Sequence, residues 1–270
     1  MIKANRIFEK RPVVFILSVT WLLYAILYLM LKQHGGMNLY VGLLAFVGEI
    51  GVEFCIIGLL FALWRKTVVR ERNMFALFGI SFLFLLMSDT IFNFVVNIYG
   101  ITSFSNALNS FINIPFIVFL ILQLIIWSSF FTRAIVEQKN KNTFLLSIPI
   151  VVTTLIVFVM FLRGNSIDDA QLFSLLGLYT ILEIVLQLLN FIFVTLTLCV
   201  TQDKPIRFVG IGFLLIIGSA SIEQLNTVMR ILKPISVIET LWVLGLLFMA
   251  FGFYNRLQNV DIKTRKWFGN

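Results

Sequence analysis

The sequence contains a single histidine, His34, and only two cysteines, Cys55 and Cys199. One histidine excludes haem held by two histidines, HExxH zinc sites and histidine-rich di-metal centres. The cysteines form no CxxC motif and fall at different predicted depths in the membrane, so we expect buried free thiols and no disulfide. P-loop and Rossmann glycine patterns are also missing. We therefore expect no cofactor.

Charge is scarce as well. Only 13% of the 270 residues are charged, 60% are hydrophobic, and the mean hydropathy is +0.99. A soluble globular protein carries about 25% charged residues. Long apolar runs separated by short polar ones indicate a helical membrane protein that crosses the bilayer several times. The lipid bilayer is thus the expected partner, and the net charge of +8 is better explained by membrane topology than by nucleic-acid binding.

Eight apolar runs are long enough to cross a bilayer, where helices satisfy their own backbone hydrogen bonds. They cover residues 12–31, 39–64, 74–97, 111–133, 143–162, 172–199, 206–229 and 235–256. The first run is too long for the apolar part of a typical signal peptide, and Lys32 follows it without a small-residue cleavage site. We therefore expect an all-α integral membrane protein with one polytopic domain over residues 1–270.

The Lys and Arg residues predict the orientation of these helices. If the N-terminus is cytoplasmic, 17 of the 21 Lys and Arg residues lie in cytoplasmic segments. Such an excess marks the cytoplasmic side of a membrane protein. We expect a multi-pass protein of the plasma or inner membrane with both termini in the cytoplasm.

Two stretches suggest an internal duplication. Gly79–Ile91 (GISFLFLLMSDTI) and Gly210–Ile222 (GIGFLLIIGSASI) share six of 13 residues without gaps. Arg133 and Arg256 close the fourth and eighth runs after the aromatic stretches SSFFTR and FGFYNR. The halves 1–140 and 141–270 would then form a 4+4 repeat of parallel orientation, related by an axis along the membrane normal.

Carboxylates inside the apolar runs are the strongest pointers to function. A charged side chain at the membrane centre costs roughly 3 kcal/mol on insertion scales, so such groups tend to face a bundle interior or a wet cavity. The acids concerned are Glu49, Glu53, Asp89, Glu183 and Glu223. The last of these has Arg230 two turns along the same helix, and an ion pair there explains it best.

The remaining acids lie on three polar helix faces. Glu49 and Glu53 are four residues apart, and Asp89 and Asn93 have the same spacing. Two carboxylates side by side in a dry site share a proton or hold a cation between them. Oxygen-rich stripes can also bind a hard cation, line a hydrated path or join helices by hydrogen bonds.

Glu183 and Gln187 form the third face. In the proposed repeat Glu183 corresponds to Glu49, so we expect the two acids to face each other across the pseudo-axis. Because the embedded acids lie in the middle or outer half of the membrane, we expect a polar cavity that opens away from the cytoplasm. Its candidate ligand-binding or ion-binding residues are Glu49, Glu53, Asp89, Asn93, Glu183 and Gln187.

Three functions fit this pattern. The first is a small transporter or channel-like protein that binds a cation, a proton or a small cationic solute at the acids. The second is a sensor, a receptor or the membrane subunit of a larger complex, which binds an external ligand and signals to a cytoplasmic protein partner. The third is an intramembrane enzyme acting on lipid, which the lack of a nucleophile–base pattern disfavours. Homo-oligomers are compatible with all three.

Overall fold

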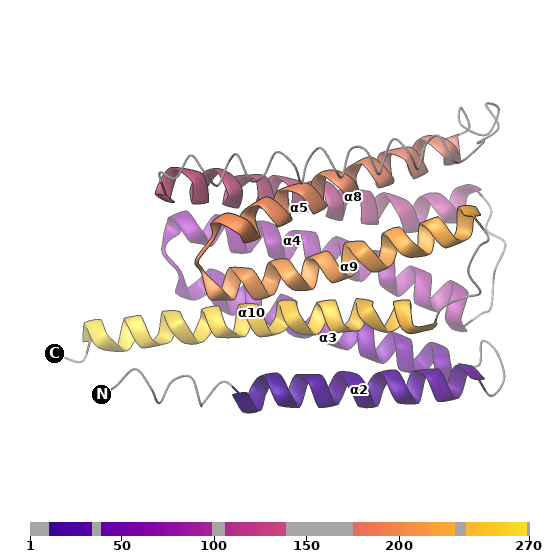
Figure 1. Ribbon diagram of the computed structural model, residues 1–270, viewed down its shortest axis with the longest axis horizontal. Helices are drawn as coiled ribbons and strands as arrows, with labels where there is room; N and C mark the ends of the chain where they lie inside the picture. Colours follow the sequence, from indigo (N-terminus) through magenta and orange to yellow (C-terminus); the bar gives the residue numbers. More distant parts are fainter. Residues whose placement is uncertain (1–10, 34–38, 99–105, 139–174, 230–235, 269–270) are drawn as a thin grey trace.

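The computed structural model describes residues 11–33, 39–98, 106–138, 175–229 and 236–268, and these are helical apart from two short turns (Figure 1). No strand occurs in this part of the chain. The elements are α2 (Arg11–Gln33), α3 (Leu39–Lys66), α4 (Val69–Phe92), the π-helix η1 (Asn93–Ile98), α5 (Asn106–Gln138), α8 (Leu175–Val200), α9 (Lys204–Met229) and α10 (Ser236–Phe268).

Seven of the eight predicted spans thus coincide with helices, and the remaining span, 143–162, lies outside the described residues. Six helices are long and apolar enough to cross a membrane, namely α3, α4, α5, α8, α9 and α10. Helix α2 adds a shorter apolar stretch, Ser18–Leu31. The described residues confirm the all-helical class, and the six long apolar helices indicate a multi-pass protein, while the count of eight, the orientation of the termini and the repeat stay predictions.

The six long helices form a closed ring. Each packs against its neighbours in the order α3, α4, α5, α8, α9, α10, and α10 packs against α3 to close the ring. Helix α2 lies outside this ring against α3 and α10 (Figure 1). Its Trp21 indole donates a hydrogen bond to the carbonyl of Thr240 in α10 over 2.8 Å.

The core of the ring is filled with aromatic side chains. Phe82 of α4 and Phe213 of α9 are fully buried, and both contact the ring of Phe119 in α5. Phe78 and Phe253 are also fully buried, with ring centroids 5.2 Å apart. Aromatic pairs in such edge-to-face arrangements add to the free energy gained from burial.

The outer surface of the helices is apolar. Large hydrophobic side chains are exposed on every helix of the ring, as lipid-facing positions require; examples are Phe54, Phe61, Leu83, Met87, Ile121, Ile125, Leu182, Ile211 and Tyr254. Both cysteines are free, as expected, but they are exposed rather than buried. Sequence indicates that a cysteine lies in an apolar helix, but not which face of the helix it occupies.

Helices α9 and α10 pack most closely through glycines. A Cβ atom on Gly245 would lie 2.6 Å from the carbonyl oxygen of Gly212, and one on Gly252 would lie 2.8 Å from the carbonyl oxygen of Pro205. No real Cβ atom comes that close to a backbone oxygen. In contrast, Gly218 has open space around it. Small residues at Gly212 and Gly245 therefore allow the two backbones to touch.

Candidate functional site

Helices α3 and α4 bring three of the predicted acids together. The Glu53 carboxyl group lies beside that of Asp89 and within electrostatic range of Glu49. Glu49 and Glu53 share one face of α3 because they are one helical turn apart. That face is turned toward α4, against which α3 packs. We call Glu49, Glu53, Asp89, Asn93 and Trp242 the acid cluster.

Glu53 is completely enclosed. Its side chain has no exposed surface, and neither carboxylate oxygen meets the geometry of a hydrogen bond, although the Asp89 carboxyl lies beside it. Buried polar groups are nearly always hydrogen-bonded, and burying an isolated charge is costly. A carboxyl group in this position therefore has an unmet requirement for a proton or a positive charge.

Two N–H donors hold the other acids of the cluster. The Asn93 amide donates to Glu49 over 2.6 Å, and the Trp242 indole of α10 donates to Asp89 over 3.2 Å. Asn93 is the first residue of η1. A π-helical turn inside a membrane helix shifts the side chains that follow it, and such turns are frequent at functional sites.

Glu183 and Gln187, both on α8, form a second polar group together with Ser221 of α9. The Gln187 amide donates to Glu183 over 3.1 Å, and Ser221 of α9 donates to the Gln187 side-chain oxygen over 2.8 Å. Of the six predicted site residues, Glu49, Glu53, Asp89 and Asn93 thus come together. The facing of Glu183 and Glu49 across an axis stays a prediction, and the side chain of Glu223 lies outside the described residues.

The described residues contain no group of three His, Cys, Asp or Glu side chains with the geometry to hold a metal ion. The acid cluster offers carboxylates, an amide and an indole, and the bonds from Asn93 to Glu49 and from Trp242 to Asp89 have N–H donors. Its chemistry is that of a carboxyl group that gains or loses a proton, or of two carboxylates that share a small cation.

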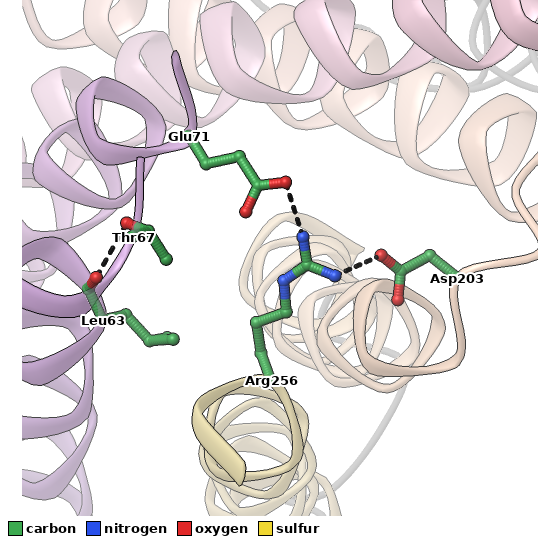
Figure 2. Close-up of polar contacts among 5 residues, drawn as sticks. All are labelled: Leu63, Thr67, Glu71, Asp203 and Arg256. Atoms are coloured by element: carbon green, nitrogen blue, oxygen red, sulfur yellow. Dashed lines mark hydrogen bonds and ion pairs between the residues drawn. The ribbon is translucent and has the colours of Figure 1, made fainter. Parts of the chain in front are cut away.

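A second charged site lies at one end of the ring. The Arg256 guanidinium of α10 donates to Glu71 over 2.7 Å and to Asp203 over 3.0 Å, and Figure 2 shows the fork of the guanidinium between the two carboxylates. We call this end of the molecule, where the α3–α4 and α8–α9 turns lie, the charged end. Arg65 and Lys66 at the end of α3, Arg72 in α4, and Lys204 and Arg207 in α9 lie at the same end.

Both acids sit at the start of a helix. Glu71 lies in the first turn of α4, and Asp203 immediately precedes α9. Carboxylates are favoured there by the exposed N–H groups and the positive end of the helix dipole. The turn before α4 is held by Thr67, whose hydroxyl donates to the Leu63 carbonyl over 2.8 Å (Figure 2). Local sequence thus positions the two acids that receive Arg256.

A pocket of about 160 Å³ opens beside this ion-pair network. It is lined by residues from α4, α5, α9, α10 and the α8–α9 turn, namely Glu71, Met74, Phe75, Phe130, Arg133, Ala134, Thr201, Asp203, Ile206 and Arg256. This site was not predicted, because Arg133 and Arg256 were interpreted as matching ends of the two repeat halves and were counted among the Lys and Arg residues that predict the topology. A usable signal was present, since Glu71 and Asp203 are acids in otherwise basic segments.

Comparison with known protein families, curated proteins and solved structures gives no match. The class of protein therefore follows from the structure alone. Six apolar helices with exposed hydrophobic faces indicate a multi-pass helical membrane protein.

Proposed function

We propose that the protein is a small transporter that works by alternating access, and that its acid cluster binds a proton or a small cation during each cycle. The enclosed carboxyl group of Glu53 carries this proposal. An ionisable group inside a membrane protein is expensive to keep and usually serves transport or proton relay. Hydrogen bonding to other helices is the ordinary structural role for such a residue, but neither Glu53 oxygen has a partner with hydrogen-bond geometry among the described residues, and its neighbour is another acid, Asp89.

The surroundings of Glu53 favour a proton over a metal ion. Metal cations take oxygen ligands from several sides. Here the Asn93 amide and the Trp242 indole point N–H groups at the neighbouring carboxylates. These donors stabilise negative charge on Glu49 and Asp89. Glu53 lies near both acids and has no such donor among the described residues, so it is the group that accepts the proton.

The aromatic core favours alternating access over an open channel. Phe78, Phe82, Phe213 and Phe253 fill the interior of the ring and leave none of their side-chain surface, or almost none, exposed. Side chains packed in this way block a continuous polar path along the described helices. A solute could cross only if helices moved relative to each other, as the halves of many transporters do.

The order of helices in the ring supports the proposed 4+4 repeat. A half-turn about the ring axis would exchange α3 with α8, α4 with α9 and α5 with α10, which is the pairing that the duplicated sequences require. Glu49 would then correspond to Glu183, and Glu53 to Gln187. In this proposal one half keeps the acid and the other half has its uncharged amide, so only one proton site is present.

Proton flux tests the proposal directly. The purified protein is placed in liposomes that contain a pH-sensitive dye, and an inside-negative potassium diffusion potential drives protons inward. We expect faster acidification than in protein-free liposomes, and loss of the excess rate in Glu53→Gln. Glu183→Gln is the matched control, since it neutralises an acid outside the cluster, and it should keep most of the rate.

Equal rates in the wild-type protein, Glu53→Gln and empty liposomes would remove proton transport from consideration. If the wild-type protein shows no flux and also co-purifies with a stoichiometric cytoplasmic protein, a role as the membrane subunit of a larger complex becomes the better explanation. Co-purification without flux therefore separates the two leading functions.

A further inference from the structure

The pocket at the charged end contains a guanidinium group and two carboxylate oxygens that have no partner among the described residues. Arg133 lines it and makes no ion pair or hydrogen bond with the described residues. Glu71 and Asp203 each give one oxygen to Arg256, namely Oε1 and Oδ2. Their other oxygens, Oε2 and Oδ1, have no partner in the described part of the chain.

The charges of the pocket balance. Arg133 and Arg256 carry two positive charges, and Glu71 and Asp203 carry two negative ones. A simple anion would be attracted by Arg133 but repelled by the two carboxylates. A simple cation would be attracted by the carboxylates but repelled by Arg133. A molecule with both charges can pair each end with an opposite partner, because complementary placement of charge decides specificity.

We propose that this pocket binds a small zwitterion that carries a carboxylate or phosphate and a primary ammonium group. Arg133 receives the anionic group, since its guanidinium matches these oxygens in a bidentate way. Glu71 Oε2 and Asp203 Oδ1 accept hydrogen bonds from the ammonium group. The inference does not rest on the proposed function, because binding here needs neither flux nor the acid cluster.

The size and walls of the pocket limit the ligand. Its volume is about 160 Å³, below the roughly 300–1,000 Å³ of pockets that bind drug-sized ligands. That space suits a small amino acid or a phosphoethanolamine group. Met74, Phe75, Phe130 and Ile206 supply apolar walls for the few carbon atoms between the two charges. The same chemistry has two sources, a free amino acid or the headgroup of an ethanolamine lipid.

Equilibrium binding to the full chain in nanodiscs tests the proposal. Radiolabelled glycine and O-phosphoethanolamine are the probes, in discs of phosphatidylglycerol and phosphatidylcholine. We expect saturable binding of at least one probe and a loss of about tenfold or more in affinity in Arg133→Gln, because a charge-assisted bidentate contact is removed. Arg133→Lys should retain part of the affinity. Trimethylglycine should bind at least about tenfold more weakly than glycine, since its ammonium group has no N–H donor.

Arg207→Gln is the matched control. Arg207 lies at the same end but outside the pocket, and among the described residues its guanidinium donates only to the Leu198 carbonyl, over 3.5 Å. The affinity of Arg207→Gln for the probes should equal that of the wild-type protein. Unchanged melting temperature in detergent shows that Arg133→Gln is folded.

A second set of discs distinguishes the two sources. If phosphatidylethanolamine in the discs displaces the soluble probes, or is retained by the wild type and not by Arg133→Gln, the lipid headgroup is the ligand. If soluble probes bind equally with and without this lipid, the free zwitterion is the ligand. Absence of binding in every disc, wild-type affinity in Arg133→Gln, or competition by acetate as strong as that by glycine would overturn the proposal.

Discussion

Arg256 reaches across the charged end to Glu71, with Nη2 and Oε1 2.7 Å apart, although α10 and α4 are separated in the ring by α3. The same guanidinium holds Asp203 at the start of α9. Three helices are therefore tied together by one side chain. In the proposed repeat, the contact with Glu71 also joins the two halves of the chain, so any rocking of one half against the other must break it.

Replacing Arg256 should loosen the charged end. In Arg256→Gln both ion pairs are lost, while a shorter, uncharged polar side chain remains. Because all three side chains are partly exposed, we expect a loss of only about 1–2 kcal/mol in the free energy of unfolding. The melting temperature in detergent measures it, and added salt should narrow the difference from the wild type.

Arg207→Gln is again the control, because it removes one positive charge from the same end without touching an ion pair. A melting temperature of Arg256→Gln that equals that of Arg207→Gln would show that the network does not hold the helices together. The double variant with Glu71→Gln should be little less stable than Arg256→Gln alone, since both changes remove the same contact.

Glu53 should carry a proton in the resting protein. Infrared difference spectra between the wild type and Glu53→Gln should show the C=O stretching band of a protonated carboxylic acid, and Glu183→Gln should leave that band in place. The enclosed position of Glu53 beside Asp89 is the physical reason, since two adjacent carboxylates in a dry site do not both keep their charge. If the difference spectrum between the wild type and Glu53→Gln shows changes only in the bands of ionised carboxylates, Glu53 carries no proton and the proposed proton site is contradicted.

The sequence predicted which segments are helical much better than it predicted the residues at which each helix begins and ends. The run 206–229 became α9 (Lys204–Met229), but the run 235–256 became α10 (Ser236–Phe268), which continues into polar sequence. Likewise the run 74–97 missed the first turn of α4, where Glu71 lies. Hydropathy marks the part of a helix that lipid covers, whereas a helix ends where its hydrogen bonding ends.

The acid cluster was only partly predictable for a different reason. Spacing showed that Glu49 and Glu53 share a face, and that Asp89 and Asn93 do. Which neighbour each face meets depends on how a helix is rotated in the ring, and apolar sequence on all sides of a helix leaves that rotation open. The partner Trp242 on α10 therefore had no sequence signal, since its contact with Asp89 joins residues 153 positions apart.

The close contact of α9 and α10 should fail when a methyl group is added. In Gly245→Ala the new Cβ would meet the Gly212 carbonyl oxygen at 2.6 Å, so the helices must separate. Overpacking of this kind costs about 1–3 kcal/mol in the free energy of unfolding. Thermal unfolding in detergent measures the loss.

Gly218→Ala provides the comparison on α9, because nothing lies within 4 Å of its added Cβ. It should be neutral or slightly stabilising, since alanine favours the helix over glycine. Equal melting temperatures for Gly245→Ala and Gly218→Ala would show that the two backbones do not touch in solution.

The charged end should face the cytoplasm, because 17 of the 21 Lys and Arg residues belong to segments on that side of the predicted topology. Gln202 lies exposed in the α8–α9 turn and is a suitable reporter. Cys55 and Cys199 are free and exposed, so both are first replaced by alanine. In Gln202→Cys on that background, a membrane-impermeant maleimide should label inside-out vesicles and leave intact cells unlabelled. Cells permeabilised before labelling give the full signal for comparison. Labelling of intact cells would invert the topology, and the zwitterion pocket would then open to the exterior.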